Sequence, residues 1–201
     1  MGIRWRKNSM VDNIKILKKN ILVTKNNLEI LIRSDLLDQI DKLSKLICNS
    51  LKKKNKILFC GNGGSASEAS HIAAEFVGRY LKERKEQPAI SLTTDNSIIT
   101  AIGNDYGFKE IFSKQIKAIG NKKDILIALS TSGKSENIIN AIKSAKKKGM
   151  ITVLFTGEQK FKFKKLLNIE INAPAKRVDR IQELHLVLLH NLCELVELKL
   201  K

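Results

Sequence analysis

Three histidines and their polar neighbours are the side chains of this sequence best suited to proton transfer. His71 and Glu75 lie four residues apart in a helix-compatible segment, so they share one face of that helix. In the last apolar-periodic segment, Gln182 and His190 lie eight residues apart, about 80° apart around the helix axis. His185 lies about 140° from His190, so these two imidazoles cannot both point into one site.

These side chains are compatible with three interpretations. A base and an acid beside phosphate-binding loops would suit proton transfer on a phosphorylated sugar. The same set of His71, Glu75, Gln182 and His190 could instead bind a divalent metal through imidazole nitrogen and carboxylate oxygen. A purely structural alternative makes His71 a buried, hydrogen-bonded residue and pairs Glu75 with Arg79 one turn later. Spacing alone leaves the three interpretations open.

Two loops each connect an apolar run to a helix-compatible segment. The first has the sequence Gly61-Asn62-Gly63-Gly64-Ser65, and the second Ser130-Thr131-Ser132-Gly133-Lys134-Ser135. Glycine lets bare backbone approach an anion, and a helix N-terminus adds unpaired N–H groups, so phosphate is the expected ligand. The second loop is not a nucleotide P-loop, because the spacing of that motif is absent. Ser135 is a candidate cap of the following helix. The alternative to an anion-binding loop is an ordinary capped turn.

Short apolar runs alternate with amphipathic segments along most of the chain. Strands are predicted at 57–60, 89–92, 125–129, 151–155 and 168–172. Helices are predicted at 67–80, within 96–119, at 135–148 and at 178–198. Two further helices between 11 and 53, interrupted over 26–34, precede the first strand. This order predicts a doubly wound α/β fold with a five-stranded parallel sheet and helices on both faces. Ligands of such sheets lie beyond the carboxyl ends of the strands, where both loops fall.

Length, charge and cysteine content limit the domain organisation, the binding partners and the location that we expect for this protein. A chain of 201 residues suits one domain, and we expect an N-terminal extension over 1–10 and a single domain over 11–201. The net charge of +17 is compatible with nucleic-acid binding, but only 5% of residues are aromatic and no stacking motif accompanies the lysines. We prefer to explain this charge by lysines on solvated helix faces and by an anionic substrate. Three widely spaced cysteines and no membrane-spanning run favour the cytoplasm.

Several separated motifs resemble those of the sugar isomerase (SIS) domain family, and within it the phosphoheptose isomerases. They occur in the family's order from about residue 11 to the C-terminus: Gly61 to Ser65, His71 to Arg79, Thr94-Asp95, Gly103-Asn104-Asp105, Ser130 to Ser135, and Arg180-Ile181-Gln182-Glu183. The resemblance implies an isomerase of D-sedoheptulose 7-phosphate and D-glycero-D-manno-heptose 7-phosphate. It also implies a homotetramer with active sites between subunits.

The resemblance assigns roles residue by residue. Glu75 and His190 would be the acid/base pair. The phosphate would be held by Ser65, Ser130, Thr131, Ser132 and Ser135, and the sugar by Asn62, Gly63, Gly64, Asn104, Asp105 and Gln182. Some family members bind zinc, one ion per subunit, and the matching ligands here are His71, Glu75, Gln182 and His190. Asp179 matches an acidic position beside the site.

Two rival functions share this fold. One is that of a non-catalytic SIS protein that binds the bacterial replication initiator, but that relative lacks the acid/base pair at the positions of Glu75 and His190. The other is isomerisation of a different sugar phosphate. The presence of Gln182 and His190 on the last helix argues against it. We expect the heptose isomerase, acting in the synthesis of a nucleotide-activated heptose for lipopolysaccharide or capsule.

Overall fold

A computed structural model describes residues 8–158 and 163–200 of the chain. Its centre is a five-stranded, entirely parallel sheet with the strand order β2-β1-β3-β4-β5. The strands are β1 (Ile57–Gly61), β2 (Ala89–Ser91), β3 (Ile125–Leu129), β4 (Ile151–Gly157) and β5 (Ile169–Ala173). The order reverses beside β1, which makes the sheet doubly wound and confirms the predicted fold class.

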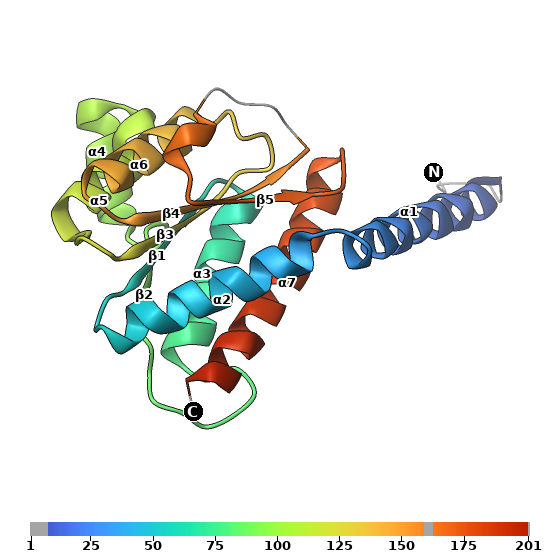
Figure 1. Cartoon of the computed structure of the whole chain (residues 1–201). Helices are drawn as coiled ribbons and strands as arrows, with labels where there is room; N and C mark the ends of the chain where they lie inside the picture. Colours follow the sequence, from blue (N-terminus) through green and yellow to red (C-terminus); the bar gives the residue numbers. More distant parts are fainter. Residues whose placement is uncertain (1–7, 159–162, 201) are drawn as a thin grey trace.

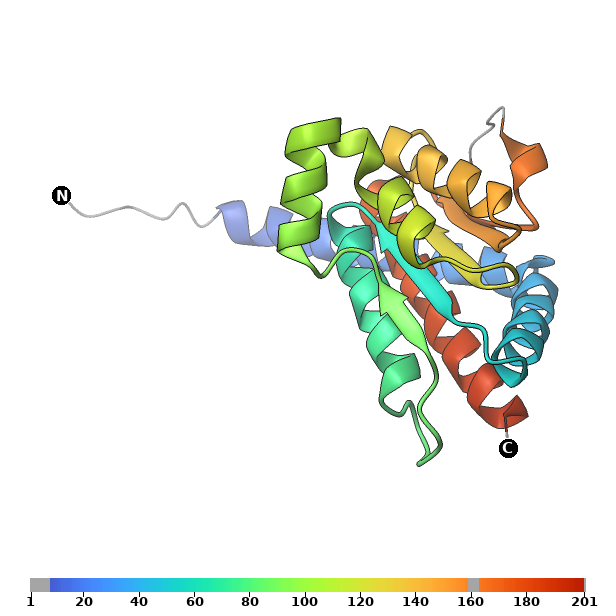
Figure 2. The ribbon, with the colours of Figure 1, turned by 90° about the vertical axis from the view of Figure 1, so that its left-hand side faces the viewer.

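Helices cover both faces of the sheet (Figures 1 and 2). On one side lie α2 (Leu36–Lys52), α3 (Gly64–Val77) and α7 (Val178–Lys199). On the other lie α4 (Asn96–Tyr106), α5 (Ile111–Ile119) and α6 (Glu136–Lys147), with short 3-10 helices at Phe108–Glu110 and Lys164–Leu166. Side chains alternate along each strand, so Phe59 enters the first core and Leu58 the second. The inner strands β1 and β3 are buried on both faces, which explains their continuous apolar sequences.

The first helix, α1 (Asn8–Ile32), projects away from the sheet (Figure 1). Only its C-terminal part packs closely: Leu31 is buried in the core beneath α2 and α7. Apolar side chains earlier in the helix remain open to solvent, with Leu17 at 56% and Ile21 at 68% exposure. Two helices before β1 were predicted, and both are present. Within the described residues, no helix is long and apolar enough to cross a membrane.

Predicted boundaries of α1 and α3 were wrong, and one of them is the end of α3, which lies at Val77 rather than at residue 80. The break between the first two helices covers only residues 33–35, because Leu28 and Leu31 pack on the core and continue α1 through the predicted bend. Helix α3 begins at Gly64 rather than at residue 67, since Gly63 takes a positive φ of 55° at the N-cap and turns the chain directly into the helix. The domain boundary near residue 10 stays a prediction, and residues 1–7 lie outside the described part.

Candidate active site

The two predicted anion-binding loops lie side by side at the carboxyl edge of the sheet. Strands β1 and β3 are neighbours, and their last paired residues are Gly61 and Leu129. A reciprocal pair of amides joins the first loop to the start of α6, directly after the second loop: Asn62 donates to Asn137 over 2.9 Å, and Asn137 donates back over 2.8 Å. The structure therefore brings together two segments that lie about seventy residues apart in the chain.

Close backbone packing shapes the first loop. A Cβ at Gly61 would lie 2.3 Å from the carbonyl oxygen of Ser65, so only glycine fits there. Ser65 is buried at the start of α3, and its hydroxyl bonds to the carboxyl group of Glu68 one turn later. A Cβ at Gly64 would lie 2.5 Å from the Nε2 atom of Gln182 on α7. The first loop thus holds the amide of Gln182 directly against its backbone.

The second loop gathers hydroxyl groups before α6. Ser130 is buried at the end of β3 and donates to the Ser135 hydroxyl over 3.4 Å. The Ser132 hydroxyl accepts the Lys134 N–H, and Gly133 takes a positive φ of 60°. Ser135 occupies the N-cap of α6, as predicted, but its side chain makes no capping bond because it is turned toward Ser130. A serine-lined loop with this shape suits an anion.

His71 on α3 and His190 on α7 meet across the helix pair. Their Nε2 atoms lie 2.8 Å apart, with the rings edge to face at 73°. At this distance one Nε2 atom must carry the proton of the hydrogen bond. The Oε1 atom of Glu75 lies 3.6 Å from the Nε2 atom of His71. The Nε2 atom of His71 therefore contacts both groups expected to act as acid and base.

The structural alternative for these residues is wrong in both parts. The His71 side chain is 47% exposed rather than buried. Arg79 pairs with Glu83 over 3.1 Å, while Glu75 faces His71. The predicted separation of His185 from the site is confirmed, since His185 is fully buried and its Nε2 atom contacts the carbonyl of Thr156.

The donor atoms near His190 suit a zinc ion chemically, since they comprise two imidazoles and a carboxylate. Their present geometry is different: the two nitrogens bond to each other at 2.8 Å, whereas two nitrogen ligands of tetrahedral zinc lie about 3.3 Å apart. Within the described ranges, three or more His, Cys, Asp or Glu side chains do not gather as a metal centre. Gln182 lies against Gly64, about 12 Å along α7 from His190.

Asn104 and Asp105 lie in the last turn of α4, on the opposite side of the sheet from α3 and α7. Both are exposed, and the Asn104 amide donates to the Asp105 carboxylate over 2.9 Å. In the described part of the chain, neither side chain bonds to the two loops or to the histidine pair. Their assignment to the sugar stays a prediction.

Two polar residues were missed by the sequence analysis. Asn137 is 3% exposed and links the first loop to the helix after the second. The only signal for it in the sequence was an amide residue in the first turn of the helix that follows the serines. Glu68 is buried on the α3 face that also carries His71 and Glu75, and its Oε2 atom has no hydrogen-bond partner in the described residues. Burial raises the pKa of Glu68 to about 7, opposed by the hydrogen bond from Ser65.

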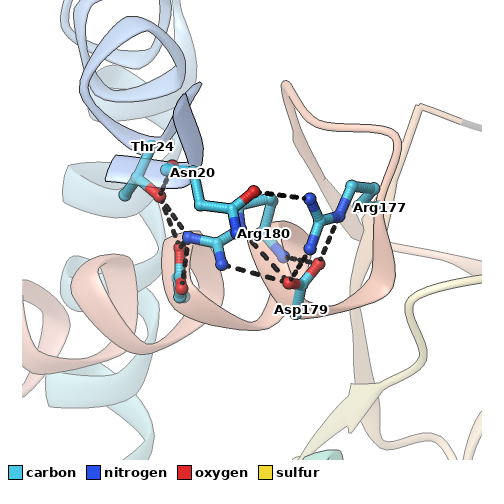
Figure 3. A network of polar contacts seen from close by, with 6 residues as sticks. Asn20, Thr24, Arg177, Asp179 and Arg180 are labelled. Atoms are coloured by element: carbon cyan, nitrogen blue, oxygen red, sulfur yellow. Dashed lines mark hydrogen bonds and ion pairs between the residues drawn. The ribbon is translucent and has the colours of Figure 1, made fainter. Parts of the chain in front are cut away.

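Charged residues at the start of α7 fasten α1 to the rest of the molecule (Figure 3). Asp179 accepts from Arg177 at 2.6 Å and from Arg180 at 3.1 Å. Arg177 also reaches Asn20 over 3.0 Å, and Arg180 bonds to Thr24. The carboxylate of Asp179 thus orients two arginines toward α1, and in the described ranges no hydrogen bond or ion pair joins it to the histidine pair.

The sequence and the fold are similar to those of known proteins. The SIS domain family model matches residues 24–157. Phosphoheptose isomerase 1 of Campylobacter jejuni is 49% identical over 159 residues, which cover 79% of this chain and 86% of the relative. The phosphoheptose isomerase of Helicobacter pylori is 44% identical and covers 94% of this chain and 96% of the relative.

A solved structure supports the same assignment. The phosphoheptose isomerase GmhA from Neisseria gonorrhoeae superposes with a TM-score of 0.85 at 37% identity, covering 91% of this chain and 97% of that one. The chain therefore belongs to the SIS domain family. Within that family it belongs to the phosphoheptose isomerases, and it is an enzyme of the isomerase class.

Proposed function

We propose that this isomerase converts D-sedoheptulose 7-phosphate to D-glycero-D-manno-heptose 7-phosphate through an enediol. The single observation that supports this most is that His190 and Glu75, from two different helices, both approach the Nε2 atom of His71. A carboxylate and an imidazole at one site can remove and return a proton. The names of the relatives supply the heptose phosphate as the substrate class.

The chemistry is a balanced exchange of protons within one molecule. One of Glu75 and His190 removes a proton from C1 of the ketose while O2 gains one, which gives the enediol. The enediol is then protonated at C2 by the other group or by the same one while the O1 hydroxyl proton leaves, which gives the aldehyde at C1. No external oxidant or reductant is needed. General acid/base catalysis of this kind accelerates a reaction by about 10²–10⁴-fold.

The two loops would hold the substrate while the proton moves. In this proposal the phosphate binds to the hydroxyls and backbone of Ser65, Ser130, Thr131, Ser132 and Ser135. The sugar hydroxyls would be bound by Asn62, Gly63, Gly64, Asn104, Asp105 and Gln182. Binding energy from the phosphate then orients carbons several bonds away, which lowers the barrier of the proton transfer. The amide pair of Asn62 and Asn137 would keep the two loops at a fixed separation.

Zinc, one ion per subunit, is the proposed cofactor. His71, Glu75 and His190 supply fitting donor atoms, and separation of the two imidazoles by about half an ångström would admit an ion. The place of Gln182 among the ligands stays a prediction. When bound, the ion would polarise the carbonyl and hydroxyl oxygens of the sugar.

We further propose a homotetramer that acts in the cytoplasm, with the heptose destined for lipopolysaccharide or capsule. The exposed apolar residues of α1 support assembly, because an unpaired apolar helix face is usually buried by a partner. Binding of nucleic acid is not proposed. A non-catalytic role at the replication initiator is disfavoured by the presence of both Glu75 and His190.

One set of assays tests these proposals. The purified chain is offered sedoheptulose 7-phosphate, arabinose 5-phosphate and fructose 6-phosphate, each before and after treatment with a chelator. We expect turnover of the heptose phosphate alone, a loss on chelation, and recovery with zinc. Activity only on another sugar phosphate would overturn the proposed substrate. Full activity in metal-free protein would overturn the proposed cofactor.

A further inference from the structure

The ring of His190 is held by few polar contacts. Among the residues that the structure describes, its one hydrogen bond joins its Nε2 atom to His71. Imidazoles that act in proton transfer are commonly oriented by a hydrogen bond on the second ring nitrogen. In this protein the described residues give the Nδ1 atom of His190 no such partner. Something else must therefore keep the plane of this ring fixed.

Tyr80 packs on the face of that ring. The ring centroids of Tyr80 and His190 lie 5.9 Å apart with the planes only 24° from parallel, which is an offset stack. His71 meets the same imidazole edge to face, with centroids 5.1 Å apart. His190 thus lies between a flat ring and the edge of another. Together these contacts restrict rotation of the imidazole about its χ2 angle.

The loop that carries Tyr80 is itself fixed to α7. The carboxylate of Glu197, two turns beyond His190, accepts the backbone N–H groups of Tyr80, Leu81 and Lys82 at 3.3, 3.1 and 3.1 Å. Glu197 is 5% exposed and also pairs with Arg84 at 3.4 Å. A buried carboxylate that accepts three N–H groups and faces a guanidinium is a strong anchor.

Arg84 extends this anchor to the helix that carries Glu75. Its guanidinium donates to the carbonyls of Glu75 at 2.6 Å, Phe76 at 2.9 Å and Gly78 at 3.2 Å. These carbonyls lie at the C-terminal end of α3, where intrahelical partners are missing, and the Phe76 carbonyl also accepts the backbone N–H of Gln87 at 3.1 Å. One loop therefore both caps α3 close to Glu75 and places an aromatic ring on His190.

We propose that Tyr80 is a positioning residue for His190, and that the loop held by Glu197 and Arg84 sets the plane of the imidazole for proton transfer. This inference rests on the proposed function. It requires the flat ring rather than the hydroxyl group of Tyr80, because the observed contact is a stack. Loss of the ring would leave His190 in place but let its plane vary.

The test compares Tyr80→Leu with Tyr80→Phe, using Leu81→Ala as a control in the same loop, since Leu81 is 56% exposed. We expect Y80L to lower kcat about tenfold with KM within about twofold of wild type. Y80F should keep nearly wild-type kcat, and L81A should match wild type. In NMR spectra, the ring protons of His190 should lose the ring-current shift in Y80L and retain it in Y80F.

The outcomes separate this inference from the proposed function. If the wild-type chain does not turn over the heptose phosphate, the proposed function fails, while the NMR comparison still tests the stack. If the wild-type chain is active and Y80L keeps its kcat, or Y80F loses as much as Y80L, the positioning role is wrong. Should Y80L not fold, Glu197→Gln decides instead. We expect E197Q to lower kcat with KM unchanged, and wild-type kcat in that variant would overturn the proposal.

Discussion

The Nε2 atoms of His71 and His190 lie 2.8 Å apart, although 119 residues separate them in the chain. The contact joins α3 to α7, and Glu75 approaches the same His71 from one turn further along α3. Two imidazoles and a carboxylate therefore form one connected group at the junction of the two helices. Its composition supports both the proton transfer and the zinc proposed above.

Replacement of Glu75 by glutamine should abolish most of the activity without unfolding the protein. The amide keeps the size of the side chain but cannot accept a proton, so kcat should fall about 10³-fold while sugar-phosphate binding persists. Coupled assays and calorimetric titration measure the two quantities. Glu83→Gln is the matched control, because Glu83 is exposed and, among the described residues, forms an ion pair with Arg79 alone. Turnover near the wild-type value in E75Q would remove Glu75 from the mechanism.

Two glycines of the first loop should respond differently to alanine. At Gly61 a Cβ collides with the backbone of Ser65, so Gly61→Ala should destabilise the protein by about 2 kcal/mol or more. At Gly64 the Cβ meets only the flexible end of Gln182, so stability should change by less than about 1 kcal/mol.

The same pair of variants tests Gln182. Because Gly64→Ala displaces its amide, kcat/KM should fall about tenfold if Gln182 binds the sugar. Urea unfolding and steady-state kinetics of both variants supply the comparison. Unchanged kinetics in a folded G64A protein would argue against a role for Gln182.

Acid should weaken the fold partly through His185. Burial lowers the pKa of this imidazole to about 4, opposed by its bond to the Thr156 carbonyl, whereas the ordinary value is 6.5. The unfolded chain therefore binds the proton at higher pH, and stability falls as the pH drops from about 6.5 toward 4. Between pH 7.5 and 5 this one group should contribute a loss of about 2 kcal/mol.

The contribution is measured by urea unfolding at both pH values. His185→Gln should lose about 2 kcal/mol less than wild type over this interval. An identical pH dependence in H185Q and wild type would show that His185 is not the group responsible.

A charge on the exposed face of α1 should disrupt assembly. Ile21 is 68% exposed, so Ile21→Asp should change the stability of the isolated subunit little. Burial of a carboxylate at a subunit contact is costly, so the same change should dissociate the proposed tetramer. Light scattering after size exclusion gives the mass, with Lys18→Asp on the same helix as the control. A tetramer in I21D, or a monomeric wild type, would contradict the proposed assembly.

Local signals predicted the elements and the loops well. The apolar runs at 57–60 and 125–129 are buried strands, and each is followed by a small-residue loop and a helix. The spacing of His71 and Glu75 correctly placed both on one helix face. The break after α1 was predicted too wide, because the burial of Leu31 depends on α2 and α7 rather than on neighbours in sequence.

Contacts between distant segments were decided by the tertiary structure alone. Three contacts join elements that no sequence periodicity relates. They are the pairing of Asn62 with Asn137, the stack of Tyr80 on His190, and the packing of the Gln182 amide against Gly64. Sequence by itself determined which side chains stand on which helix, strand or loop, since that depends on local backbone geometry. Which of them touch depends on how the parallel sheet brings α3, α6 and α7 together, and packing of the whole chain sets that arrangement.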